Sequence, residues 1–344
     1  MYRWAIILGV LAGLLFGVAT PLSKILLNTL NSFEAAGLLY LGAFIGVAPF
    51  VLKDLRQKEC WQGILRNRNK ILSFVFFGGM LGPLLLMLGL KTAHSASVSI
   101  WLNLELVWTV LLGWLFFRES FDKVTLLGML LALAAGVTTS IGEGFHEIIP
   151  ALLIAGACFC WAIDNQQTGS LDTVTPQMAT FIKGLVAGSI NFTIGCFIAG
   201  KIPVPEVISG ALVIGIFAYG ASIAFYVICA QNIGASRSQI LFSTAPFWGV
   251  LLAWVLLGEP ILFSQIIAMI LLLTGVIAVN VLRHGHEHKH EETEHIHYHT
   301  HDDQQHNHHD ELLSNARHMH LHSHITIEHS HKHFPDLHHR HKHV

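Results

Sequence analysis

The sequence predicts an all-α integral membrane protein with ten transmembrane helices, arranged as two inverted five-helix repeats, plus a disordered His-rich C-terminal tail. Three observations support this prediction. The 344 residues are 53% hydrophobic and 12% charged, and this charged share is about half that of a soluble globular domain. Long apolar stretches recur through the first 283 residues, and part of this region repeats at an offset of 140 residues. The last 61 residues hold 22 of the 24 histidines.

The charge is divided in the same way as the hydropathy. Residues 1–283 contain 15 Lys/Arg and 12 Asp/Glu, a net charge of +3, whereas residues 284–344 contain 5 and 10, a net charge of −5 with His neutral. We therefore expect three parts, which are a first repeat at 1–143, a second repeat at 144–283 and the tail at 284–344.

Apolar stretches of membrane-spanning length define the ten expected helices. About 20 apolar residues are needed to cross a hydrocarbon core ~30 Å thick. The stretches that qualify are 4–30, 33–52, 71–90, 95–117, 124–141, 148–166, 177–199, 207–230, 235–257 and 262–282. The first follows only Arg3 and is longer than the apolar region of a cleavable signal peptide, so we expect it to be the first span.

Basic residues in short loops predict the orientation. The loop between the second and third spans holds the densest basic cluster of the body, which is Lys53, Arg56, Lys58, Arg66, Arg68 and Lys70. Placing this loop in the cytoplasm puts both termini there after ten crossings. The fifth connection carries Glu143 and Glu147 and no Lys or Arg, which suits the outside. The expectation is a multi-pass protein in the lipid bilayer of the cell inner (plasma) membrane.

The internal repeat covers two helices and their connection. Residues 108–119 read WTVLLGWLFFRE, and residues 248–259 read WGVLLAWVLLGE. The same offset pairs GMLL at 128–131 with AMIL at 268–271. Because each unit contains five spans, the second unit must enter the membrane from the opposite side. Inverted repeats of this kind place a binding site near the bilayer midplane in many transporters.

Glu105 is the first candidate for a substrate-binding residue, because a charge near the bilayer centre is costly and usually functional. It lies about ten residues into its span, near mid-depth. Trp101 and Trp108 share its helix face at i, i+4 and i+7 spacing. A carboxylate between two indoles can bind a cationic or hydrogen-bonding substrate, or carry a coupling proton. The alternative is a packing carboxylate bonded to Asn103 or to a neighbouring helix.

Other polar residues lie nearer to the expected helix ends. Lys24 can attract an anionic substrate or extend to the interface, and Lys183 is expected to extend to the interface. Asp164 and Asn165 lie beside Trp161 near the inner end of the sixth span, where a role in gating or substrate passage competes with an interfacial helix end. The candidate substrate-binding residues are therefore Lys24, Trp101, Asn103, Glu105, Trp108, Trp161, Asp164 and Asn165.

Short motifs occur along the body in a defined order. They are FGVATPLSK at 16–24, GLKTA at 89–93, LNLE at 102–105, FRE at 117–119, CWAIDN at 160–165, and AP followed by GEP between 245 and 260. This set covers about residues 5–282 and resembles the EamA-type carriers of the drug/metabolite transporter (DMT) superfamily. The resemblance implies a carrier that moves small metabolites by alternating access. We expect its central cavity to be lined by spans one, three, four, six, eight and nine.

Three positions depart from the pattern of that family. Phe16 replaces a tryptophan, Ala245 stands where a glutamate often precedes the proline, and Leu39-Tyr40 occupies the usual second-span arginine region. These positions lie where the resemblance implies substrate contact, so it implies no particular substrate.

The tail consists of histidine-rich runs such as HGHEHKH, HIHYHTH and HMHLHSH. It has no periodic apolar face, so we expect disorder, with a short helix open near 312–317. Neutral imidazole suits Zn, Cu, Ni and Co, and the flexible tail is expected to bind such ions without a fixed geometry. The candidate metal ligands are His284, His286, His288, His290, His295, His297, His299, His301, His306, His308, His309, His318, His320, His322 and His324.

Two functions compete. The first is secondary transport of an amino-acid-like or other polar organic solute, with the tail as an appended chelator. The second is transport or export of Zn, Ni, Co or Cu, with the tail delivering, buffering or sensing the metal. A metal path needs several convergent ligands, and His94 is the one histidine near the spans on either side, so organic-solute transport is favoured. A membrane-anchored metal sensor or store without transport is a third alternative.

Other classes of function are not expected. The sequence contains no phosphate-binding Gly-rich loop, so neither an enzyme nor transport driven directly by ATP is predicted, and coupling to a proton gradient or plain exchange is the default. No cofactor is required and no nucleic-acid partner is expected. A small-molecule substrate is expected, and a homodimer is left open.

Overall fold

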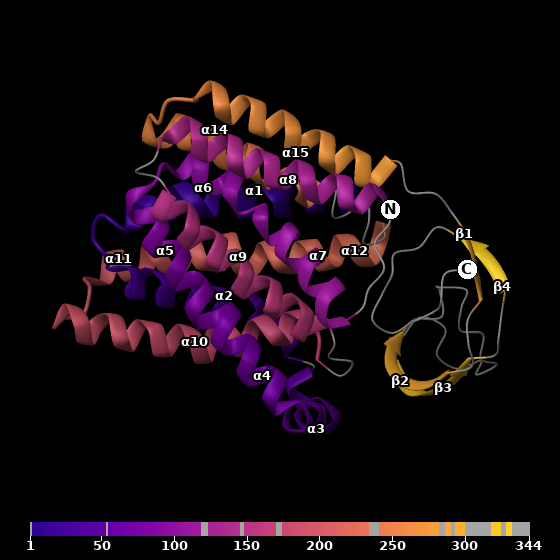
Figure 1. Cartoon of the computed structure of the whole chain (residues 1–344). Coiled ribbons are helices and arrows are strands. Elements are labelled where there is room, and N and C mark those ends of the chain that lie inside the picture. Colours follow the sequence, from indigo (N-terminus) through magenta and orange to yellow (C-terminus); the bar gives the residue numbers. More distant parts are fainter. Residues whose placement is uncertain are drawn as a thin grey trace.

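The computed structural model describes most of the hydrophobic body and four short segments of the tail. The described residues are 2–52, 54–117, 123–144, 148–169, 174–233, 241–281, 286–289, 293–299, 318–324 and 328–331. Within the body these residues form a bundle of helices (Figure 1).

The helices follow one another in two comparable series. The first series is α1 (Tyr2–Leu26), α2 (Ser32–Val51), η1 (Asp54–Arg56), α3 (Lys58–Arg66), α4 (Arg68–Phe74), η2 (Val75–Leu81), α5 (Gly82–Thr92), α6 (Ser95–Trp101), α7 (Leu104–Phe117) and α8 (Lys123–Glu143). The second is α9 (Ile148–Gly169), α10 (Pro176–Ala199), α11 (Pro205–Ile214), η4 (Gly215–Ala221), α12 (Ser222–Ile233), α14 (Ala245–Leu257) and α15 (Phe263–Val281).

The described helices account for the expected spans with one difference in kind. Eight helical segments of the described chain, from Trp4–Leu26 to Pro205–Cys229, are long and apolar enough to cross a membrane. Two shorter apolar helices, Ala245–Leu257 and Phe263–Ala278, lie at the ninth and tenth expected positions, so the count of ten crossings stays a prediction. The basic loop also contains a short helix, α3, which the sequence analysis did not predict.

Two long helices contain a π-helical turn at equivalent positions. These turns are η2, between α4 and α5, and η4, between α11 and α12. Their first residues, Val75 and Gly215, are separated by 140 positions, the offset of the sequence repeat. Turns of this kind are rare and occur frequently at functional sites, and η2 contributes to the site described below.

The two series pack through an exchanged set of helix pairs. Helix α2 packs on α10 and α8 packs on α15; α1 contacts α12 and α14, while α9 contacts α5 and α7. Glycines allow some of these backbones to touch. A Cβ added to Gly37 of α2 would lie 2.4 Å from the backbone nitrogen of Phe192 in α10, and one added to Gly215 would lie 2.2 Å from the carbonyl oxygen of Leu39. Close approach through small residues is typical of helices packed in a membrane.

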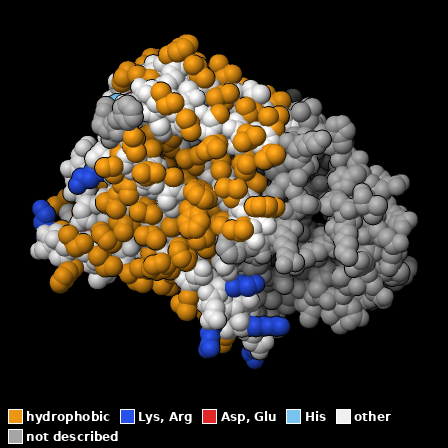
Figure 2. All heavy atoms as spheres, viewed as in Figure 1, with side chains coloured by type: hydrophobic (Ala, Val, Ile, Leu, Met, Phe, Trp, Pro, Cys, Tyr) orange, Lys and Arg blue, Asp and Glu red, His pale blue; other side chains and the backbone are white. Residues whose placement is uncertain are grey.

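The surface of the body is apolar. Figure 2 shows hydrophobic side chains over most of the visible helical face, with Lys and Arg at its left and lower edges. Phe197, Ile141 and Phe263 are each more than 75% exposed. Such a continuous apolar surface is unusual for a soluble monomer and suits contact with lipid.

The described tail segments form two antiparallel strand pairs. β1 (His286–Lys289) pairs with β4 (Glu328–His331), and β2 (Thr293–His299) pairs with β3 (His318–His324). At these residues the structure differs from the expected disorder, because residues alternate with the period of a strand. The candidate ligands His284, His290, His301, His306, His308 and His309, and the segment 312–317, lie outside the described residues.

Candidate substrate-binding cavity

The fourth expected span is broken near its middle. Helix α6 ends at Trp101 and α7 begins at Leu104. The side-chain amide of Asn103 donates to the carbonyl oxygen of Ile100 (3.1 Å), and the thiol of Cys158 donates to that of Leu102 (3.6 Å). These partners satisfy carbonyl groups that the break releases, as the bilayer interior requires.

The break overturns the continuous helix face expected for Trp101, Glu105 and Trp108. Trp101 is fully buried, and its indole nitrogen donates to the carbonyl oxygen of Gly136 in α8 (3.2 Å). Trp108 instead packs edge-on against Phe159 of α9, with 5.2 Å between ring centroids. Glu105 therefore does not lie between two indoles, because the turn at 102–103 rotates α7 relative to α6.

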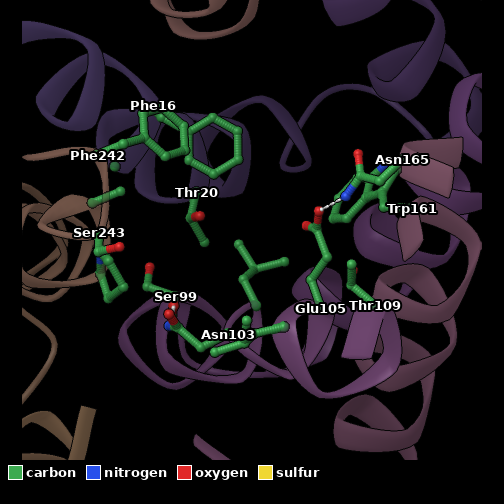
Figure 3. A pocket seen from close by; sticks show the side chains of 15 residues that line it. Phe16, Thr20, Ser99, Asn103, Glu105, Thr109, Trp161, Asn165, Phe242 and Ser243 are labelled. Carbon is green, nitrogen blue, oxygen red and sulfur yellow. Dashed lines mark hydrogen bonds between the residues drawn. The ribbon is translucent and has the colours of Figure 1, made fainter. Parts of the chain in front are cut away.

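A cavity of about 260 Å³ lies beside this break. Its walls come from α1, the α6–α7 region, α9 and the segment that leads into α14 (Figure 3). The lining residues are Phe16, Gly17, Thr20, Ser99, Leu102, Asn103, Glu105, Leu106, Thr109, Trp161, Asn165, Phe242, Ser243, Ala245 and Pro246. Among the described residues, spans one, four, six and nine thus contribute, whereas the expected contributions of spans three and eight are not found.

Glu105 supplies the charge of this cavity. It is the one ionisable side chain among the described lining residues. Its Oε1 accepts a hydrogen bond from the side-chain amide of Asn165 at 2.6 Å (Figure 3). Around it, the lining combines aromatic rings from Phe16, Trp161 and Phe242 with hydroxyl and amide groups. The cavity therefore offers one anionic anchor inside a mixed aromatic and polar wall.

The indole of Trp161 is held in place from behind the cavity. Its ring nitrogen donates to the carbonyl oxygen of Gly78 (3.1 Å) and to the hydroxyl of Tyr40 (3.3 Å). The Tyr40 hydroxyl in turn donates to the same carbonyl (2.8 Å). Gly78 lies in the π-helical turn η2, so this turn supplies the acceptor that fixes one wall of the cavity. Tyr40 thus contacts the site indirectly.

Asp164, next to Asn165 on α9, faces away from the cavity lining. Its Oδ2 lies 2.5 Å from the ammonium nitrogen of Lys183 on α10, and the two side chains are 5% and 14% exposed. The hydroxyl of Thr168 donates to the other carboxylate oxygen (3.0 Å). The prediction that Lys183 extends to the interface is therefore wrong, because Asp164 offers an opposite charge at the same depth.

Lys24 also has a local role. Its ammonium group donates to the carbonyl oxygens of Leu90 (2.8 Å), Lys91 (3.1 Å) and Ala93 (2.8 Å) at the end of α5. These are carbonyl groups that a helix leaves unpaired at its C-terminus. Lys24 thus caps a neighbouring helix and is absent from the described cavity lining.

Four of the eight predicted site residues line the cavity, namely Asn103, Glu105, Trp161 and Asn165, and four do not, namely Lys24, Trp101, Trp108 and Asp164. A substrate-binding role stays a prediction for all eight. Sequence reasoning missed the hydroxyl residues Thr20, Ser99, Thr109 and Ser243, which carry no distinctive local pattern. Phe16 and Ala245 had a signal, because both depart from the family pattern.

Comparison with known proteins addresses the whole body. The EamA-like transporter family matches the chain twice, at residues 3–141 and 148–281. The chain belongs to the EamA-like transporter family. This confirms the resemblance inferred from the motifs and shows two copies of the EamA-like domain. The match ends at residue 281, so the tail lies outside it.

Individual relatives agree with this assignment. A protein described as an uncharacterized transporter, from Methanothermobacter thermautotrophicus, is 28% identical over 291 residues, which cover 79% of this chain and 85% of that protein. A solved structure titled "Crystal structure of protein" matches with a TM-score of 0.56 and 17% identity, covering 82% of this chain and 98% of that one. The latter shows a shared fold. This EamA-like protein is thus a multi-pass membrane transporter.

Proposed function

We propose that this EamA-like protein is a secondary transporter for a small polar organic solute that carries a protonated amine, amino-acid-like or otherwise. The observation that carries this proposal is Glu105, the one ionisable side chain among the described residues that line the cavity. A carboxylate in a partly desolvated cavity attracts a cation more strongly than it would in water.

The remaining lining supports a solute rather than a bare ion. The rings of Phe16, Trp161 and Phe242 can contact an ammonium group or an apolar part of the solute. Hydroxyl and amide groups, including those of Thr20 and Asn103, can bind its polar atoms. A cavity of about 260 Å³ is slightly smaller than the pockets of ~300–1,000 Å³ that hold drug-sized ligands, which favours a metabolite.

Transport would proceed by alternating access between two inverted repeats. Each family match covers one series of helices, and an odd number of crossings per copy would invert the second copy. The exchanged helix pairs support this symmetry. The turns at 102–103 and 243–244 lie next to the cavity in both copies and give each copy a point at which a half-helix can tilt. The gating step is assigned to these turns.

Transition-metal transport through the body is the second candidate. Within the described residues, no group of three or more His, Cys, Asp or Glu side chains can hold a metal ion. The cavity therefore favours the organic solute, and the histidines of the tail are treated as a separate feature below.

The test is uptake by proteoliposomes that contain the full-length protein. A panel of radiolabelled amino acids and amines would be compared with Zn²⁺, Ni²⁺ and Co²⁺ under an imposed proton gradient. We expect amine uptake that Glu105→Gln abolishes. Glu206→Gln is the matched control, because Glu206 is exposed at the start of α11. Uptake of metals alone, or full amine uptake by the Glu105→Gln protein, would overturn the proposal.

A further inference from the structure

The two strand pairs of the tail bring histidines opposite one another. In the β2–β3 ladder the opposed residues include His295 with His322, His297 with His320, and His299 with His318. In the β1–β4 ladder His286 opposes His331, and His288 opposes His329. Every histidine of these four strands therefore has a histidine as its cross-strand partner.

We propose that the β2–β3 ladder is a discrete binding site for a divalent transition metal ion such as Zn²⁺, built from cross-strand histidine pairs. Residues two apart in a strand lie on the same face of the ladder, so all six of its histidines share one face. Directly opposed residues in antiparallel strands have Cβ atoms ~4.5–5.5 Å apart. Two neighbouring pairs bring four imidazoles together, the number that tetrahedral Zn²⁺ takes.

The opposite face of the same ladder gives the strands a reason to pair. Between the histidines, Ile296 opposes Leu321 and Tyr298 opposes Met319. Two apolar cross-strand pairs thus alternate with three histidine pairs. The expectation that the tail has no periodic apolar face is therefore wrong for this ladder. Cross-strand pairs with an aromatic or apolar partner stabilise antiparallel strands by about 0.2–1 kcal/mol each, which is weak alone and leaves room for the metal to complete the structure.

The ligand chemistry selects the class of ion. A site made of neutral imidazoles suits Zn²⁺, Cu²⁺, Ni²⁺ and Co²⁺ and disfavours Mg²⁺, which prefers oxygen ligands. Because a preformed site is absent from the unpaired strands, metal binding and strand pairing would be coupled. This coupling distinguishes the ladder from a flexible chelating tail, in which affinity depends only on the number of histidines. The inference is independent of the proposed transport function, because it concerns residues outside the family match.

The experiment uses the full-length protein in detergent and titrates it with ZnCl₂ in a calorimeter. The first variant combines His295→Asn, His297→Asn and His299→Asn. Its matched control combines His306→Asn, His308→Asn and His309→Asn, which removes the same number of histidines outside the ladder. We expect the first variant to lose at least tenfold in affinity at the tightest site and the control to keep the wild-type value. MgCl₂ should give no saturable signal.

A second variant separates the ladder from its ligands. Ile296→Ser with Leu321→Ser keeps every histidine and removes one apolar pair, and we expect a several-fold loss of Zn²⁺ affinity. Circular dichroism would verify that the helical body is unchanged in all variants. Equal losses in the two histidine variants, together with wild-type affinity in the serine variant, would overturn the proposal in favour of a flexible chelating tail.

Discussion

Asp164 and Lys183 form an ion pair between α9 and α10, with 2.5 Å between Oδ2 and Nζ and at most 14% of either side chain exposed. The Lys183 ammonium group also lies 5.8 Å from the centroid of the Phe74 ring. The pair lies directly behind the cavity wall formed by Trp161 and Asn165. It ties together helices from the second series and the π-helical turn of the first.

Removing one partner of this pair should destabilise the protein strongly. Asp164→Asn or Lys183→Met leaves an unpaired buried charge, with an expected cost of about 3–5 kcal/mol. The double variant removes both charges and should be more stable than either single variant. Thermal unfolding of the detergent-purified proteins measures this order. A double variant as unstable as the sum of the two single variants would show that the two residues act independently.

Gly78 should not tolerate a side chain. A Cβ at this position would lie 2.2 Å from the Oδ2 atom of Asp164, so Gly78→Ala must displace the carboxylate from Lys183. We expect a loss of about 1–3 kcal/mol, as for other overpacked sites. Gly210→Ala in α11 is the matched control, because a Cβ there meets open space and should stabilise the helix by about 0.5–1 kcal/mol. Equal melting temperatures for the two variants would contradict the prediction.

Asn165 should act as a positioning residue for Glu105. Asn165→Ala removes the 2.6 Å hydrogen bond to the carboxylate, which then samples more conformations before the solute binds. Ordering a side chain on binding costs about 0.5–1.5 kcal/mol, which corresponds to roughly a 2- to 10-fold higher KM for the amine. The maximal rate should change less than KM. Thr193→Val, on an exposed part of α10, should leave both constants unchanged, and a wild-type KM for Asn165→Ala would refute the role.

Lys24 should contribute to stability more than to solute recognition. Lys24→Met removes all three of its hydrogen bonds to carbonyl groups at the end of α5. Hydrogen bonds to charged groups are worth about 1.5–3 kcal/mol each, so the melting temperature should fall clearly. Lys24→Arg keeps the charge and should recover part of the loss. If Lys24→Met melts like the wild type but loses uptake of an anionic solute, the substrate-binding interpretation from the sequence stands.

The inverted arrangement of the two copies can be tested by accessibility. Single cysteines at Arg66 in α3 and at Lys201, which follows α10 and is exposed, would be introduced into a cysteine-free background. Opposite orientation of the repeats places these residues on opposite sides of the bilayer. A membrane-impermeant thiol reagent should then label Lys201→Cys in intact cells and Arg66→Cys only after the membrane is opened. Labelling of both in intact cells would exclude the inverted repeat.

The sequence was sufficient for the features that depend on local composition. Long apolar stretches predicted the helices, and ordered motifs predicted the EamA-like family, which is confirmed by a match at 3–141 and 148–281. Glu105 stood out because a carboxylate in an apolar stretch is rare, and the structure places it in the cavity. The alternation of Ile296 and Tyr298 with histidines was also visible in the sequence, and the prediction of disorder overlooked it.

Only the tertiary structure decided which groups meet. The partner of Glu105 is 60 residues away in the chain, and the carbonyl groups capped by Lys24 are 66 to 69 residues away. An apolar run carries no local signal for the break at 102–103, because the cost of a broken helix depends on whether a neighbour such as Cys158 satisfies the freed carbonyl groups. Hydrophobicity specifies that a helix enters the membrane, whereas pairing of polar groups inside it depends on which helices lie side by side.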